Sequence, residues 1–180
     1  MRAYKVLRDG RSEFTGLCWP LPVGERPGAW VHADGPLELC VRGIHSCTAD
    51  QLPQWLGSEI WEVELGGEIM PSEPAVLSMQ ARLVRRLEAW DPDAHVRFAL
   101  HCAERAHATI ARYPDGEELF TIKIEPFSKL GMAAAVGYWT ALLAGECATG
   151  RRSGPDYDAA FARERALQAE WLKRELALAS

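Results

Sequence analysis

The hydrophobic pattern of this chain changes near residue 90, from the two-residue period of strands to the longer period of helices. The clearest alternation lies at 59–65, where apolar and acidic side chains fall on opposite faces. The apolar face holds Trp61, Val63 and Leu65, and the acidic face holds Glu62 and Glu64. Such alternation is typical of a strand with one buried face. We therefore expect Trp61 to lie in the core.

Weaker strand signals surround this segment. Asp9-Gly10 lies between apolar runs and predicts a two-residue hairpin turn. Residues 82–90 fit either a strand or a helix. Shorter strand candidates are 30–32, 37–39 and 76–77. We predict an antiparallel sheet within residues 2–90, plus one strand near 118–125, where apolar and polar residues alternate again.

Beyond residue 90 the spacing predicts three helices, at about 95–112, 132–148 and 157–177. The last is expected to be capped by Asp156. In the first, His107 falls on the apolar face and is expected in the core or lining a pocket. The other residues of that face are Val96, Ala99, Leu100, Ala103 and Ile110. The sum is an α+β fold, a single domain over 1–180 with the helices packed against the sheet.

Composition adds bounds on the class of protein. The 180 residues are 48% hydrophobic and 25% charged, which is typical of a folded domain. No apolar run reaches the ~18 residues of a membrane span, and the first residues lack a signal-peptide pattern. The five cysteines are odd in number and show no paired spacing. We expect a cytoplasmic protein without disulfides, bound metal, cofactor or membrane partner.

The charge distribution argues against nucleic acid as a partner. Residues 1–80 hold 6 Lys and Arg against 11 Asp and Glu, while 81–180 hold 14 of each. Neither part is basic, and nucleic-acid binding draws much of its affinity from neutralising phosphates.

The densest group of reactive side chains lies within 40–48. His45 and Cys47 are the candidate catalytic residues there, and Arg42 and Ser46 are candidate ligand-binding residues. Four tryptophans lie around this segment: Trp19, Trp30, Trp55 and Trp61. Tryptophan suits both cores and ligand pockets, so we predict a pocket around residues 40–64, with Trp19, Trp30 and Trp61 as ligand-binding residues.

Three chemical interpretations of this segment stay open. Cys40, His45 and Cys47 together with Cys18 match the donor types of a zinc site, although the spacing fits no known motif. Cys47 or Cys40 paired with His45 as base would form a nucleophile. In the third interpretation His45 is an interior histidine bonded to backbone, and the cysteines are small core residues.

Glu146 is a further catalytic candidate. It is the only charged residue between Lys129 and Arg151, in an otherwise apolar predicted helix. Burial near the C-terminal end of a helix would raise its pKa and suit a general acid. The alternative is that it emerges beside Arg151 or Arg152.

The chain resembles a family of uncharacterised actinobacterial proteins over most of its length. The resemblance rests on Tyr4-Lys5-Val6-Leu7, Gly43-Ile44-His45-Ser46-Cys47, Trp61-Glu62-Val63-Glu64-Leu65 and Tyr157-Asp158-Ala159-Ala160-Phe161. The shorter Gly-Ile-His-Ser-Cys core is also similar to small phage-encoded proteins of unknown function. Neither likeness implies an activity.

A weaker likeness is to the ADP-ribosyltransferase fold. It would assign Arg8, Ser46 and the pair Glu62/Glu64 to gripping NAD and the ribosyl cation. The glutamate pair follows Ser46 by only 16 residues, fewer than that fold needs.

Three functions follow as hypotheses. The first is a protein that binds or modifies a small molecule in the pocket around residues 40–64. The second is an interaction or regulatory module that forms a homodimer through the C-terminal helix around Phe161 and Trp171. The third is an ADP-ribosyltransferase-like enzyme.

Overall fold

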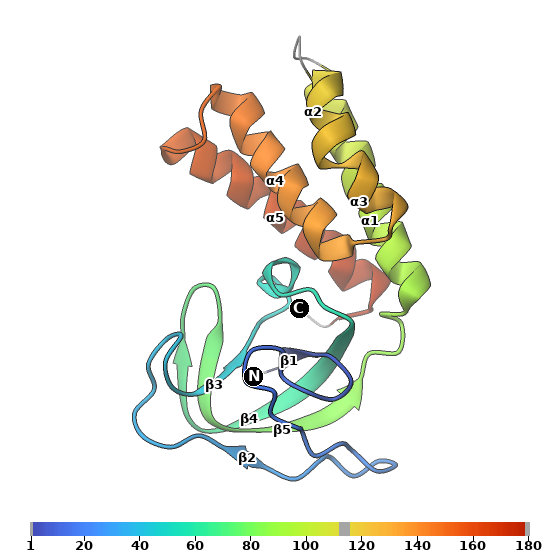
Figure 1. The fold of residues 1–180 in the computed structure, drawn as a ribbon. Coiled ribbons are helices and arrows are strands. Elements are labelled where there is room, and N and C mark those ends of the chain that lie inside the picture. The colour runs from blue at the N-terminus through green and yellow to red at the C-terminus, as the bar shows by residue number, and fades with distance from the viewer. Residues whose placement is uncertain (1, 112–115, 179–180) are drawn as a thin grey trace. The chain divides into compact units, whose positions relative to one another are not determined.

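The computed structural model describes residues 2–111 and 116–178, which form two compact units (Figure 1). Of the described residues, the first unit comprises 2–90 with 178, and the second comprises 91–111 and 116–177. The first is built of strands and the second of helices, so the α+β class with an N-terminal antiparallel sheet is confirmed.

The β unit is one antiparallel sheet that closes on itself. Its strands are β1 (Arg2–Leu7), β2 (Val31–His32), β3 (Ile44–Ser46), β4 (Glu59–Pro71) and β5 (Val76–Arg86), with a 3-10 turn at Leu52–Gln54. They follow the order β1-β4-β5-β2, and β3 pairs with β5 beside β2. Tyr4 and Cys47 exchange backbone hydrogen bonds of 2.8 and 2.9 Å, which join β1 to the end of β3. The sheet is therefore a small closed barrel.

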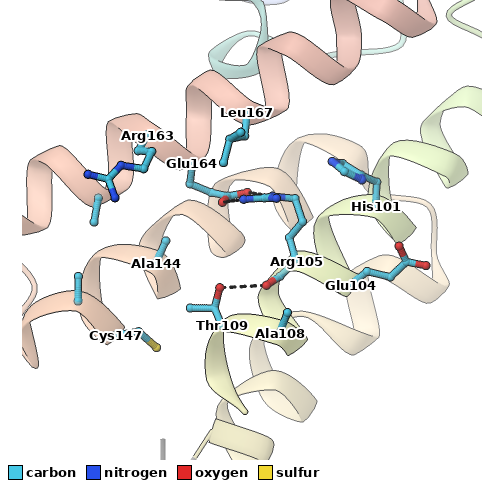
Figure 2. A pocket seen from close by; sticks show the side chains of 12 residues that line it. His101, Glu104, Arg105, Ala108, Thr109, Ala144, Cys147, Arg163, Glu164 and Leu167 are labelled. Atoms are coloured by element: carbon cyan, nitrogen blue, oxygen red, sulfur yellow. Dashed lines mark hydrogen bonds and ion pairs between the residues drawn. The ribbon is translucent and has the colours of Figure 1, made fainter. Parts of the chain in front are cut away.

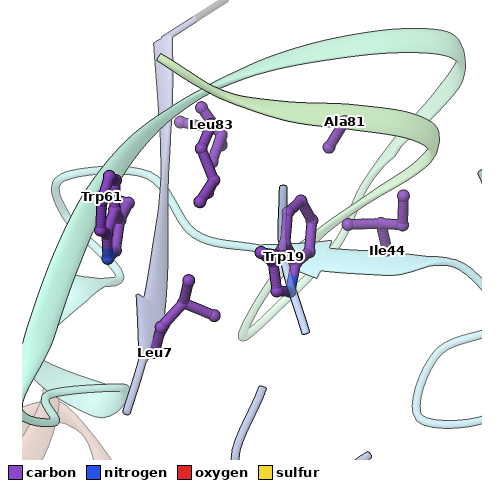
Figure 3. Packing of buried hydrophobic residues seen from close by; sticks show 8 residues of the cluster. Leu7, Trp19, Ile44, Trp61, Ala81 and Leu83 are labelled. Carbon is purple, nitrogen blue, oxygen red and sulfur yellow. The ribbon is translucent and has the colours of Figure 1, made fainter. Parts of the chain in front are cut away.

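The barrel interior is set by the register of β1 against β4. Ala3 lies opposite Val63, and Lys5 opposite Trp61. Partners in an antiparallel pair face the same side, so all four side chains belong to the inner face. The core cluster, most of it labelled in Figure 3, consists of Ala3, Leu7, Trp19, Ile44, Trp61, Val63, Ala81 and Leu83.

The predicted alternation at 59–65 is confirmed. Trp61 and Val63 are buried at 8% and 2% exposure. On the outer face, Glu62 and Glu64 pair with arginines of β5. The Nη2 atoms of Arg85 and Arg82 approach these carboxylates at 2.8 and 2.7 Å, respectively. The hydrophobic pattern therefore fixed which face of β4 is buried.

The local turns are partly as predicted. Asp9 and Gly10 have φ of 51° and 68°, and Arg8 and Arg11 exchange two 2.9 Å hydrogen bonds, as in a type I′ hairpin. The strand expected at 37–39 is wrong, because Glu38–Arg42 form a tight turn. The ambiguous segment 82–90 is a strand as far as Arg86.

The helical unit contains α1 (Pro92–Ile110), α2 (Gly116–Lys123), α3 (Glu125–Lys129), α4 (Ala133–Thr149) and α5 (Pro155–Glu175). The three predicted helices correspond to α1, α4 and α5, and α4 packs against both of the others. Among the described residues, no helix is long and apolar enough to span a membrane.

The strand predicted near 118–125 is wrong, because this segment lies in α2 and the start of α3. Phe120 and Ile124 are four residues apart, and Ile124 is buried while Ile122 is exposed. The burial therefore follows helical spacing. A pattern with an apolar residue at every second position also places apolar residues four positions apart, so it fits one helix face as well. Glu117 in the first turn and Lys123 in the last complement the helix dipole.

The predicted face of the first helix is confirmed in part, since Ala99, Ala103 and Ile110 are buried, but the buried face as a whole is rotated in the structure. Phe98 and Cys102 are fully buried, whereas Val96 and Leu100 are 43% and 50% exposed. α1 packs on α4 through the row that contains Cys102, whose carbonyl accepts a hydrogen bond from Thr140. His107 was expected in the core or lining a pocket, and the core position is wrong, because its side chain is 57% exposed.

The predicted cap of the last helix is also wrong. Gly154 occupies the N-cap, and Pro155 follows as the first helical residue. Proline suits this position because its missing N–H would have no partner there.

Candidate functional site

His45 lies on β3 and bonds to backbone groups through both ring nitrogens. Its Nε2 accepts a hydrogen bond from the backbone N–H of Cys40 at 3.0 Å, and its Nδ1 lies 3.1 Å from the carbonyl oxygen of Gly43. A neutral ring with the proton on Nδ1 satisfies both contacts. The imidazole therefore holds the Glu38–Arg42 turn against β3. Catalysis by His45 stays a prediction, and in this geometry neither nitrogen is available as a base.

Cys47 is enclosed in the barrel wall. Burial raises the pKa of its thiol to about 12, with the nearby Lys5 acting in the opposite direction. The thiol Sγ donates to the carbonyl of Tyr4 at 3.5 Å. Since the thiolate is the nucleophilic form, this environment does not favour a nucleophilic Cys47.

The other residues predicted around this site have separate environments. Ser46 is buried at 5% exposure, while Arg42 is exposed and 3.5 Å from Glu38. Trp19 and Trp61 belong to the barrel core. The ring of Trp30 lies under the guanidinium of Arg82, at 4.7 Å.

Two of the alternative interpretations find no support in this geometry. The carboxylates Glu62 and Glu64 pair with arginines on the outer face of the barrel, and Arg8 pairs with Glu13. Over the described ranges, no group of three or more His, Cys, Asp or Glu side chains is arranged to hold a metal ion.

Glu146 lies in the last turns of α4, in the helical unit. Its carboxylate accepts from Arg152 Nε at 2.8 Å. The carboxylate thus emerges at the helix end beside an arginine, which is the alternative given above for this residue.

The C-terminal helix uses its aromatic residues within its own unit. Trp171 meets Phe98 edge to face at 5.3 Å and stacks on His101 at 5.7 Å. Phe161 packs near Tyr138 and Tyr157. The predicted homodimer stays a prediction, and these rings already have neighbours within the helical unit.

The helical unit contains a pocket of about 540 Å³ between α1, α4 and α5 (Figure 2). This volume falls within the range of small-molecule sites. Part of its lining is alanine, which leaves space where larger side chains would fill it: Ala108, Ala144, Ala148 and Ala160. The polar part of its lining includes His101, Glu104, Arg105, Thr109, Arg163 and Glu164.

A two-point ion pair forms one side of this pocket. Arg105 donates to both carboxylate oxygens of Glu164, from Nε at 2.8 Å and from Nη2 at 2.6 Å (Figure 2). The Glu164 side chain is 5% exposed and that of Arg105 31%. The hydrogen bond to Glu164 raises the pKa of Arg105. This pairing fixes the guanidinium plane and leaves the Nη1 donors outside the two-point contact.

Polar residues continue from this pair into the bundle core. Arg165 donates to Gln168 Oε1 at 2.8 Å, and Gln168 Nε2 donates to the carbonyl of Gly137 at 2.9 Å. Burial lowers the pKa of Arg165 to about 10. The buried face of α5 thus carries polar groups where a bundle built only for stability would carry apolar ones.

The charges lining the pocket balance. Arg105 and Glu164 neutralise each other, and the exposed Arg163 and Glu104 add one charge of each sign. Burial, and then the charge of Arg105, lowers the pKa of His101, which favours the neutral imidazole. The lining therefore presents donors and acceptors without a net charge.

The pocket and one residue of the barrel were missed by the sequence analysis. The pocket residues lie on three helices, and only their packing brings them together. The inward position of Lys5 could have been predicted from the sequence, since Lys5 lies between Ala3 and Leu7 on the inward face of β1. A lysine at an inward position of a half-buried strand is itself a signal.

The chain matches no family model, and no curated protein or solved structure is significantly similar to it. The resemblance to actinobacterial and phage proteins stays a prediction.

Proposed function

We propose that this protein binds a small polar molecule of no net charge in the pocket between α1, α4 and α5. The observation that supports this most is the pocket of about 540 Å³ with a rigid, two-point Arg105–Glu164 pair in its lining. A ligand site typically combines apolar surface with a few fixed polar groups. The pocket has both, from its alanines and from this pair.

Charge balance selects the class of ligand. A site for an anion would carry an excess of cations, but here Arg163 is offset by Glu104. An amino acid, which is a zwitterion, or a nucleoside, which is neutral, would satisfy such groups without leaving a charge unpaired. A triphosphate or NAD would bring several negative charges to a site that has no excess of cations to pair with them. The pocket predicted around residues 40–64 stays a prediction. It is a second candidate site for small-molecule binding, separate from the pocket between the helices.

The test is a thermal-shift screen of the full chain with amino acids, nucleosides, nucleoside triphosphates and NAD. A ligand at a hundred times its Kd stabilises the folded state by about 2.7 kcal/mol, which raises the melting temperature by several degrees. We expect a shift with at least one amino acid or nucleoside, and none with the anions.

Matched variants locate the binding. Ala144→Phe fills the pocket, whereas Ala134→Phe adds the same ring at an exposed position of the same helix, outside the pocket lining. Arg163→Gln replaces the charged guanidinium of the lining by an uncharged amide. Because Arg163 is exposed, this variant keeps its fold even where Ala144→Phe disturbs the packing. The shift should vanish in Ala144→Phe, weaken in Arg163→Gln and persist in Ala134→Phe. If no neutral compound shifts melting, or if the shift survives both pocket variants, the proposal is wrong.

A further inference from the structure

Lys5 occupies an inward position of the barrel. It lies between Ala3 and Leu7 on β1, which both belong to the core cluster, and opposite the buried Trp61 on β4. Lysine is seldom placed on such a face, because its ammonium group loses hydration there. The side chain as a whole is half-buried, and its amine is largely enclosed.

The amine has one carbonyl and one aromatic ring as neighbours. Its Nζ donates to the backbone oxygen of His45 at 2.6 Å and lies 5.4 Å from the centre of the Trp19 ring. Lys129 and Lys173, in contrast, each form an ion pair with a glutamate of their own helix. In the described part of the chain, no carboxylate pairs with Lys5.

This environment favours the neutral amine. Burial lowers the pKa of Lys5 from 10.5 to about 8, against the opposing influence of the Cys47 thiol. Around neutral pH, the fraction present as free amine is therefore a few hundredfold larger than for a lysine of ordinary pKa. A desolvated lysine of this kind is the usual form of a nucleophilic amine in proteins.

We propose that Lys5 is a reactive amine that forms an imine with small aldehydes. The nitrogen lone pair attacks the carbonyl carbon and gives a carbinolamine, which loses its oxygen as water when the C=N bond forms. One water is released, and nothing is oxidised or reduced. This site lies in the barrel and is independent of the helical pocket.

The test is reductive trapping of the folded full-length chain with formaldehyde or glycolaldehyde and limiting cyanoborohydride. The hydride converts the imine to a stable secondary amine. Cleavage by an arginine-specific protease after Arg2 and Arg8 places Lys5 on peptide 3–8, whether or not it is modified, and apart from the α-amino group on peptide 1–2. The chain has only four lysines, at positions 5, 123, 129 and 173, and fragment ions separate the two that share peptide 113–151, so the modification of each is measured separately.

We expect Lys5 to be modified about tenfold faster than Lys129 or Lys173 near pH 7.5, with a rate that levels off above about pH 8. Lys123 is the matched control, since its amine also lies over a tryptophan ring, at 4.5 Å from the centre of Trp139. In 6 M urea the preference should disappear, because it comes from the fold.

Equal rates for the four lysines in the folded chain would refute the proposal and leave Lys5 as a link between β1 and β3. Slower modification of Lys5 than of Lys123 would refute it equally. Lys5→Met keeps peptide 3–8 intact and should abolish its labelling, and a persisting label there would show that another group reacts.

Discussion

Removing Arg105 should destabilise the helical unit far more than its partial exposure suggests. Both oxygens of the Glu164 carboxylate accept from this one guanidinium, and the Glu164 side chain is only 5% exposed. Arg105→Met keeps the aliphatic stem but leaves that carboxylate buried without its two donors. Loss of one partner of a buried pair costs about 3–5 kcal/mol. Arg165 is close enough to interact with Glu164, so we expect the lower end of this range.

The reverse change should be milder. In Glu164→Met the remaining Arg105 is 31% exposed and can turn its charge toward water, so we expect a loss of about 1–2 kcal/mol. The double variant removes both charges, and replacing a buried pair by apolar side chains is often close to neutral. It should therefore be more stable than Arg105→Met alone.

Urea unfolding followed by circular dichroism at 222 nm measures these differences, since that signal comes mainly from the helical unit. Fits should allow separate transitions for the two units. A loss of less than about 0.5 kcal/mol in Arg105→Met, the size of an ordinary surface change, would contradict this prediction. Simple addition of the two single losses in the double variant would contradict it as well, because the pair would then have no coupling energy.

Three further predictions concern the cores of the two units. Lys5→Met should be more stable than the wild type at pH 7, by up to about 3 kcal/mol. The pKa of Lys5 is lower in the folded state than in the unfolded state, so burying its charge costs stability below pH 8, and this cost fades as the pH rises toward 10.5. Denaturation of both proteins at pH 7 and pH 10 checks the trend. A stability difference between them that does not change with pH would contradict it. Gly145→Ala should lower stability by about 1–3 kcal/mol despite the better helix propensity of alanine, because the new Cβ would lie 2.5 Å from the Tyr157 ring; an increase in melting temperature would count against that contact. Trp61→Ala should cost about 3–5 kcal/mol in chemical denaturation, since the side chain is part of the barrel core, and a change the size of a surface substitution would remove it from that core.

Several local features were predictable because they depend on residues close in sequence. The Asp9-Gly10 turn needs two residues with positive φ, a conformation that Gly and Asp tolerate. The buried face of 59–65 follows from strict alternation, since a one-residue slip would expose every apolar side chain. The position of the Glu146 carboxylate at the end of α4, beside Arg152, was likewise one of the two outcomes predicted for this residue.

Other features were ambiguous at the same local level. Phe120, Ile122 and Ile124 fit a strand by alternation, but Phe120 and Ile124 also fit one helix face. On α1, the buried row through Phe98 and Cys102 and the exposed row through Val96 and Leu100 are equally well spaced. Packing against α4 selects the first row, and this information lies about 40 residues away in the chain.

Local patterns of residues specify the β-then-α order, the three long helices and the buried face of β4. These depend on period and turn chemistry, which are local. Long-range packing, in contrast, brings β1 and β3 together to close the barrel, places Lys5 inside it, and pairs Arg105 with Glu164 beside a pocket. The last pair is separated by 59 positions. Contacts over such distances depend on the packing of whole elements, and no pattern within a short window specifies them.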